Sequence, residues 1–461
     1  MTLDSGDIYP DRHVLYRSVQ ELPPTAVNAK GIYIYLDDGS KILDAVGGAS
    51  VSCLGHSHPD VISAMTKSLN ENLIYAYSLK YTSNEAEELA DLLLKDRPGG
   101  LTKAHFVSSG SEAMEAALKV ARQYFVEIGQ TQRTIFIGRE QSYHGNTIGA
   151  LSIGGHWSRR EPFEPILSKA MTHVAPCYPY RHQQKDESSA EYVDRLINEL
   201  DSKFQELGPE NVIAFVMEPI VGNATGCVAA LPGYIAGVRK LCDKYGALLI
   251  FDEVMCGMGR TGDLHAWQHE GIPPDIQTMG KGLGGGYQPI AAVLINERVV
   301  EGLSKAASFN SGHTYQAHPL TCVAATAVQK IIIRDNLLEN VKNMGALLER
   351  ELRAAFADNP IVGDIRGRGL FWGLELVADR DTKAPISTKA GTADLVSIEG
   401  MKHGVALLSS GGTMDGVNGN HVIISPPYNV TEDEVKLIVS LTKKSIDAVA
   451  DTLIQKGYVK G

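Results

Sequence analysis

Three short apolar segments, each followed closely by a charged residue, constrain the fold of this chain more than any other feature. The segments and the charged residues after them are Ile213–Met217 with Glu218, Ala247–Phe251 with Asp252, and Ile276–Met279 with Lys281. Continuous apolar runs of this length are typical of strands buried in a parallel sheet. Because the carboxyl ends of parallel strands meet at one edge, we expect the three charged side chains to face one crevice.

Helical and strand-like segments alternate from about residue 60 to 320, which indicates an α/β domain with a mainly parallel sheet covered by helices. Further strands are predicted at Ala104–Val107, Thr134–Ile137 and Ile290–Ile295, and helices at Glu85–Leu94, Glu191–Leu207, Tyr234–Tyr245 and Pro319–Ile333. Residues 150–190 contain glycines and prolines and are expected to form irregular covering loops.

With 461 residues, the chain is too long for one simple core. The N-terminal part contains a hairpin pattern, with strands at Gly31–Leu36 and Lys41–Asp44 around the turn Asp37–Ser40. After about residue 336 the pattern is helix, strands, helix. We therefore predict a large domain at 61–325 and a small α+β domain built from 1–60 and 326–461.

Lys281 stands among five glycines in the segment 280–286. Glycines of this density let the backbone come close to a bound group, so the lysine is either a phosphate clamp or a covalent handle. Positions 280–285 match G-x-G-x-x-G, but Pro289 and a strand pattern follow where a dinucleotide site needs a helix. A nucleotide site is therefore disfavoured.

A second candidate site begins at Ser108, where a strand pattern gives way to a helix. Ser109 and Glu112 fit a capping box, and Gly110 and Ser111 would lie at the helix N-terminus. Free N–H groups and the positive end of the helix dipole favour an anion there, although an ordinary N-cap has the same sequence.

The loop Ser142–Gly145 places Tyr143 beside His144. It either contributes to a binding site or is an ordinary surface turn. A pyridoxal phosphate site needs a lysine, a carboxylate for the pyridine nitrogen, a phosphate cup and a flat group against the ring. Lys281, Asp252, Ser109–Ser111 and Tyr143 supply these parts.

With these parts together, the chain resembles the class III (ω-type) aminotransferases, which have fold type I of the pyridoxal-phosphate enzymes. The resemblance extends over nearly the whole chain. It is carried by Gly55–Pro59, Ser108–Ala113, Ser142–Gly145, Glu218–Ile220, Phe251–Val254, Gly257–Gly262, Lys281 and Gly312–Tyr315.

The resemblance implies a pyridoxal 5′-phosphate-dependent aminotransferase in which Lys281 forms the internal aldimine and carries the proton. It also implies that Asp252 pairs with the pyridine nitrogen and that Glu218 lies near the cofactor O3′. The implied cofactor site further contains Ser109, Gly110, Ser111, Tyr143, His144, Gly145 and Val254, with Thr314 crossing from the neighbouring subunit. A homodimer or a dimer of dimers follows from that shared site.

The substrate side departs from the family pattern. Many relatives bind a substrate carboxylate with an arginine near a C-terminal Pro-Pro pair, but residues 401–430 contain no arginine and Ile423 stands at the near position. Residues 48–52 are all small. We therefore predict an ω-amino acid or a bulky, carboxylate-free amine as donor and a keto acid or aldehyde as acceptor.

Predicted pocket residues are Ser50, Tyr77, Arg181 and Ile423, and Arg181 or Arg159 could replace the missing arginine. Aminomutases, decarboxylases and phospho-lyases share this scaffold and stay open as alternatives, as does a catalytically silent binding protein.

Charge, apolar runs and residue spacing argue against several other classes of protein. The net charge of −11 argues against a nucleic-acid or membrane-surface partner. No apolar run approaches the ~20 residues of a membrane-spanning helix. The N-terminus has no secretory pattern, so the cytoplasm is the expected location. The six cysteines are scattered and His56 and His58 have no third ligand nearby, so we expect no metal.

Overall fold

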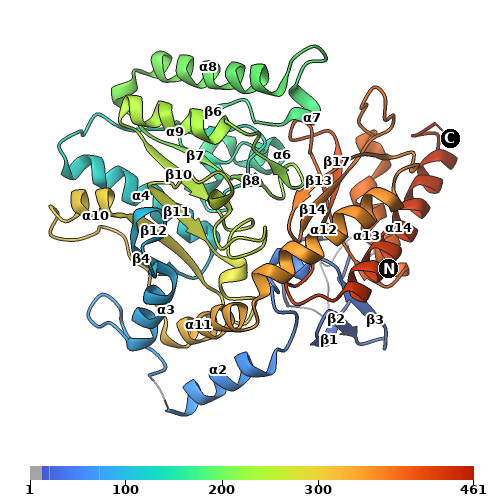
Figure 1. The fold of residues 1–461 in the computed structure, drawn as a ribbon, viewed down its shortest axis with the longest axis horizontal. Coiled ribbons are helices and arrows are strands. Elements are labelled where there is room, and N and C mark those ends of the chain that lie inside the picture. Colours follow the sequence, from blue (N-terminus) through green and yellow to red (C-terminus); the bar gives the residue numbers. More distant parts are fainter. Residues whose placement is uncertain (1–12, 20, 72, 461) are drawn as a thin grey trace.

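The computed structural model describes residues 13–19, 21–71 and 73–460. Its centre is a seven-stranded sheet in the order β4-β12-β11-β10-β7-β5-β6 (Figure 1). These strands are Leu101–Val107, Ala291–Asn296, Ile276–Met279, Leu248–Asp252, Val212–Met217, Ile135–Arg139 and Met171–Val174. Strand β12 alone runs opposite in direction to the other six strands of this sheet, so the predicted mainly parallel sheet is confirmed.

Helices cover both faces of the sheet. Side chains alternate along each buried strand, so neighbouring residues face opposite helical layers. Ala214 and Val216 face one cluster with α4 (Gly110–Glu127) and α10 (Glu297–Leu303). Phe215 and Met217 face the opposite cluster with α8 (Ser189–Leu207) and α9 (Tyr234–Tyr245), which lie together at the top of Figure 1. Helices α3 (Asn84–Leu94) and α11 (Pro319–Arg334) pack near β4 and β12.

The expectation for residues 150–190 is wrong in part. They contain the end of α5 (Ile148–Ile153), α6 (Trp157–Arg160), α7 (Pro179–His182) and the start of α8 (Ser189–Leu207), and they include the sheet's edge strand β6. Strand β6 has four residues, of which only Val174 is fully buried. A segment this short, with three of its four residues only partly buried, leaves no apolar period in the sequence.

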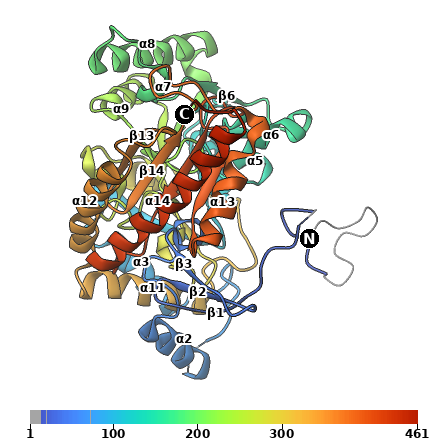
Figure 2. The same ribbon diagram turned by 90° about the vertical axis from the view of Figure 1, so that its right-hand side faces the viewer.

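The N-terminal strands and the C-terminal part of the chain pack together beside the large sheet (Figure 2). Strands β1 (Ala26–Lys30), β2 (Tyr33–Leu36) and β3 (Lys41–Asp44) form one sheet, which β15 (Val405–Ala406) joins beside β3. A second sheet has the order β13-β14-β17-β16, formed by Val362–Arg368, Phe371–Leu376, Asn420–Ile424 and Leu408–Gly411.

Helices α12 (Leu337–Ala355), α13 (Thr392–Lys402) and α14 (Glu432–Gln455) share one apolar cluster with buried residues from the N-terminal part, including Ile32 and Val61. Helix α2 (Pro59–Glu71) begins at the predicted proline. The domain boundaries at 60 and 325 remain predictions, and they fall within α2 and α11.

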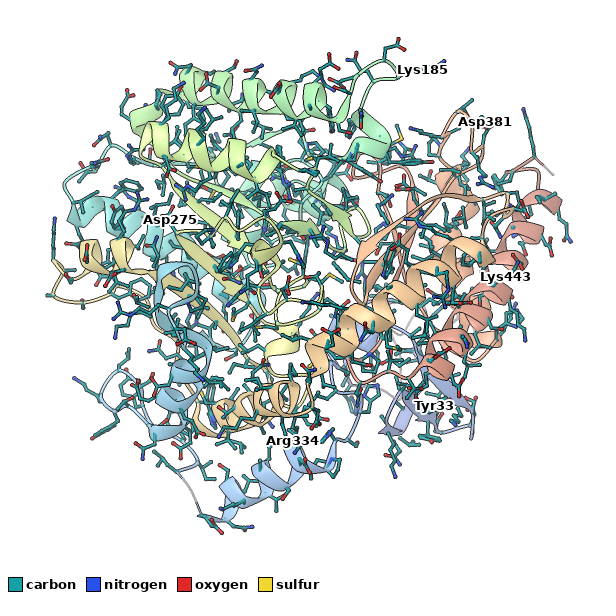
Figure 3. All side chains as sticks on the ribbon, in the orientation of Figure 1. Tyr33, Lys185, Asp275, Arg334, Asp381 and Lys443 are labelled. Carbon is teal, nitrogen blue, oxygen red and sulfur yellow. The ribbon has the colours of Figure 1, made fainter. Side chains whose placement is uncertain are left out.

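Asp275, labelled in Figure 3, fixes the start of β11 against its neighbours. Its carboxylate accepts hydrogen bonds from Leu249 N at 2.8 Å, Asn296 Nδ2 at 2.9 Å and Arg239 Nη1 at 2.8 Å. These bonds tie β10, β12 and α9 to the strand that leads to Lys281.

Within the described residues, no helix has both the length and the apolar character that crossing a bilayer requires. Most of the N-terminal segment on which the secretory prediction rests lies outside those residues.

Candidate active site

Strands β7, β10 and β11 lie side by side in the central sheet, so the residues at their carboxyl ends share one edge. Glu218, Asp252 and Lys281 line a cavity of about 160 Å³ at this edge. The same cavity is lined by six further residues of the sequence-based prediction, Gly110, Ser111, Tyr143, His144, Gly145 and Val254.

Lys281 opens a short 3₁₀ turn directly after β11 and has φ +42°, a left-handed conformation that costs a non-glycine residue free energy. Its carbonyl accepts hydrogen bonds from Gly284 N at 3.1 Å and Gly285 N at 2.9 Å, which hold this turn. A Cβ at Gly282 would lie 2.9 Å from Tyr428 Oη, so the residue after the lysine has little room for a side chain.

Burial lowers the pKa of Lys281 to about 8, although the carboxylates of Asp252 and Glu218 act in the opposite direction. Among the residues that the structure describes, Lys281 Nζ has no hydrogen-bond or ion-pair partner. Since the neutral amine is the nucleophilic form, the lowered pKa favours covalent chemistry over charge clamping.

Asp252 is buried at the end of β10, and three donors fix its carboxylate. His144 Nδ1 lies 2.8 Å from Oδ2, while Oδ1 accepts from Val254 N at 3.0 Å and Thr278 Oγ1 at 3.2 Å. His144 Nε2 is buried without a partner in the described part of the chain. The carboxylate is therefore held in one orientation toward the cavity it lines.

Glu218 is buried after β7 and joins two loops of the site. Its carboxylate accepts from Tyr143 N at 3.2 Å and from Gly222 N at 3.0 Å. Burial is the main cause that raises the pKa of Glu218. Glu218 thereby positions the backbone of Tyr143 at the cavity wall.

The N-terminus of α4 forms another wall. Ser109 is the N-cap, and its Oγ accepts from Glu112 N at 3.2 Å. The Glu112 carboxylate accepts from Ser108 N at 2.7 Å, one residue before the position that a capping box would use. Gly110 begins the helix, and a Cβ there would lie 2.9 Å from Val254 Cγ1. Free N–H groups at this helix end suit an anion.

The predicted pocket residues Ser50, Tyr77 and Ile423 and the predicted cofactor-site residue Thr314 lie outside the cavity lining. Ser50 is buried, with Oγ 2.7 Å from Ser425 Oγ. Ile423 is buried in β17, in an apolar cluster with Met255. Tyr77 and Thr314 are exposed, and the Thr314 carbonyl accepts a hydrogen bond from Tyr75 Oη at 3.0 Å.

Arg181 is also absent from the cavity lining. Its Nε donates to Glu375 Oε1 at 2.5 Å, and both side chains are almost completely buried. A guanidinium in this ion pair is not free to bind a substrate. Moving it away would leave the buried Glu375 carboxylate with one fewer cation to neutralise its charge.

Asn223 and Met255 line the cavity but were not predicted. Asn223 Oδ1 accepts from Ser410 Oγ at 2.9 Å, a bond between residues far apart in the chain. Their only sequence signal is their position shortly after the strand ends at Glu218 and Asp252.

Comparisons with known proteins agree with this geometry. The family described as aminotransferase class-III matches residues 15–446. An uncharacterised aminotransferase of Schizosaccharomyces pombe is 45% identical over 98% of both chains. The putrescine–pyruvate aminotransferase of Pseudomonas aeruginosa is 32% identical over 92% of this chain and 91% of its own.

A solved ω-transaminase from Pseudomonas jessenii in complex with PMP superposes with a TM-score of 0.88 at 33% identity, covering 93% of each chain.

Proposed function

The chain belongs to the class-III aminotransferases, which are pyridoxal-phosphate-dependent enzymes, and from that premise we propose its substrates. The donor is an ω-amino acid or a bulky, carboxylate-free amine, and the acceptor is a keto acid or an aldehyde. One observation carries this proposal. Residues 401–430 contain no arginine, and Ile423 is fully buried among apolar side chains at the place where relatives bind a carboxylate.

The residues lining the cavity fit the cofactor by their chemistry. They supply one amine from Lys281, one fixed carboxylate from Asp252, and a helix N-terminus at Gly110 and Ser111 for the phosphate. Tyr143 and Val254 supply the side chains for the two ring faces. When bound, the cofactor condenses with amines and withdraws electrons from the carbon that bears the nitrogen.

The protein's part in catalysis is proton transfer and orientation. Lys281 Nζ, with its pKa lowered to about 8, exists in both protonation states near neutral pH and can accept a proton at one carbon and return it at another. Asp252, held by His144, Val254 N and Thr278, keeps its carboxylate at one place on the cavity wall.

The name of the relative from Pseudomonas aeruginosa, putrescine–pyruvate aminotransferase, supports a diamine donor and a keto-acid acceptor for this chain.

A donor panel tests the proposal. We expect 4-aminobutyrate, 1,4-diaminobutane or 1-phenylethylamine to aminate pyruvate faster than L-glutamate or L-ornithine does through its α-amino group. Lys281→Ala should lower every rate by about 10²- to 10⁴-fold, the usual contribution of a proton-transferring group. Faster transfer from α-amino groups throughout the panel would contradict the substrate assignment. Decarboxylated or eliminated products without an aminated acceptor would favour the alternative reactions.

A further inference from the structure

Most arginines around the site are already engaged within the described residues. Their partners are the Glu218 carbonyl for Arg139, Glu375 for Arg181, the carbonyls of Leu370 and Pro426 for Arg260, and Asp364 with Glu375 for Arg366. Each of these guanidinium groups is held by at least one buried acceptor, although Arg139 Nε, Arg181 Nη2 and two nitrogens of Arg260 have no partner among the described residues.

Arg159 differs from these arginines. Arg159 is not in the cavity lining, but its guanidinium carbon lies 4.7 Å from the centre of the ring of Tyr143, which is. The side chain is half-buried, and it forms no hydrogen bond or ion pair in the part of the chain that the structure describes. Burial, with a smaller contribution from Arg17, lowers the pKa of Arg159, while Tyr143 acts in the opposite direction. A partly buried guanidinium that has no carboxylate partner can form strong, charge-assisted hydrogen bonds with an anion.

Arg159 also lies beside the strands on which the expected arginine is missing. Helix α6 is attached to the β16–β17 connection by a hydrogen bond from Ser158 N to Gly416 O at 3.1 Å. His421 in β17 is close enough for the charge of Arg159 to act on it. Arg159 in α6 therefore lies beside the strand pair β16–β17, in which Ile423 occupies the position near the Pro-Pro pair.

We infer that Arg159 binds the carboxylate of the keto-acid acceptor, a specificity that rests on the proposed function. The planar guanidinium offers two parallel N–H donors to a carboxylate, and stacking on Tyr143 fixes its plane. A donor without a carboxylate makes no use of this contact. The same site therefore admits a carboxylate-free amine and still recognises a keto acid.

Pyruvate and propanal form a matched pair of acceptors, because propanal lacks the carboxylate. We expect Arg159→Leu to lower kcat/KM of the holoenzyme for pyruvate by about 10- to 100-fold, as for loss of a charge-assisted bidentate contact. The value for propanal should change by less than about twofold. Arg159→Lys should recover part of the pyruvate activity, because it keeps the charge but not the fork.

Binding of propionate, which carries a carboxylate but cannot react, gives a readout independent of turnover. Calorimetric titration of the holoenzyme should show a Kd about tenfold weaker in Arg159→Leu, and no change in Arg17→Leu. The inference would be overturned if Arg159→Leu lowered kcat/KM equally for pyruvate and propanal, or if it left the Kd of propionate unchanged. A selective loss of pyruvate activity in Arg17→Leu instead of Arg159→Leu would also overturn it. A wild-type enzyme that aminates neither acceptor would contradict the proposed function instead.

Discussion

At the scale of single residues, the surroundings of a charged group decide what it can do. Lys281 and Arg181 are both basic side chains predicted for the site. Lys281 lines the cavity without a partner among the described residues, whereas Arg181 is paired with Glu375. The lysine keeps its reactivity because its charge is disfavoured by burial and is not fixed by a salt bridge.

The lowered pKa of Lys281 predicts a pH dependence for cofactor uptake. The pKa lies at about 8, below the ordinary value of 10.5, so the neutral amine accumulates as the pH rises through 8. We expect the rate at which the apoenzyme binds pyridoxal phosphate covalently to rise about tenfold between pH 7 and pH 9. Stopped-flow absorbance measures this rate. A flat profile in the wild type, or an equal rise in Lys281→Ala, would contradict the assignment.

At the scale of elements, the start of α4 depends on the absence of a side chain at Gly110. The closest group is Val254, whose Cγ1 would lie 2.9 Å from an added Cβ. That distance is too short for an undisturbed contact, so a methyl group would displace a side chain that lines the cavity.

Gly110→Ala tests this packing. Alanine is a good helix former, and Gly110 is not in the left-handed region, so we expect little loss of fold stability. The displaced Val254 should weaken the affinity for pyridoxal phosphate by about tenfold, or ~1.4 kcal/mol, in a fluorescence titration of the apoenzyme. Gly154→Ala is the control, because its added Cβ meets only ordinary contacts from 3.4 Å. Equal affinity in both variants would show that Val254 has room to move.

At the scale of the whole molecule, one surface is more apolar than a free surface usually is. Large apolar or aromatic side chains are exposed along residues 73–81 and at Tyr315, including Leu79, Tyr81 and Tyr315 at 53%, 68% and 64%. Tyr75 joins this segment to the Thr314 loop, with its ring centre 6.0 Å from that of Tyr315. Contiguous patches of this kind are typical of protein interfaces.

We propose that this surface forms the homodimer and carries Thr314 to the neighbouring cofactor site. Leu79→Asp with Tyr81→Asp should shift sedimentation from dimer to monomer and reduce cofactor retention, because charged groups at an interface core are disfavoured. Ile398→Asp on α13, another exposed apolar position, should leave both properties unchanged. A monomeric wild type, or a double variant with the wild-type mass, would contradict the proposal.

Local chemistry in the sequence determined the strands that lead to Glu218, Asp252 and Lys281 and the capped start of α4. Apolar runs, caps and glycine turns act over a few residues, so they can be recognised without the rest of the chain. The shared sheet edge followed from these strands because parallel strands have one common polarity.

Only the tertiary structure decided which polar groups remain free. Arg181 faces a carboxylate and Arg159 does not, because the fold places Glu375, which is 194 positions away along the chain, beside Arg181. Asn223, Met255 and the edge strand β6 likewise obtained their places from contacts distant in sequence. Competition for partners is a property of the folded molecule, because burial and distance set the free energy of each ion pair.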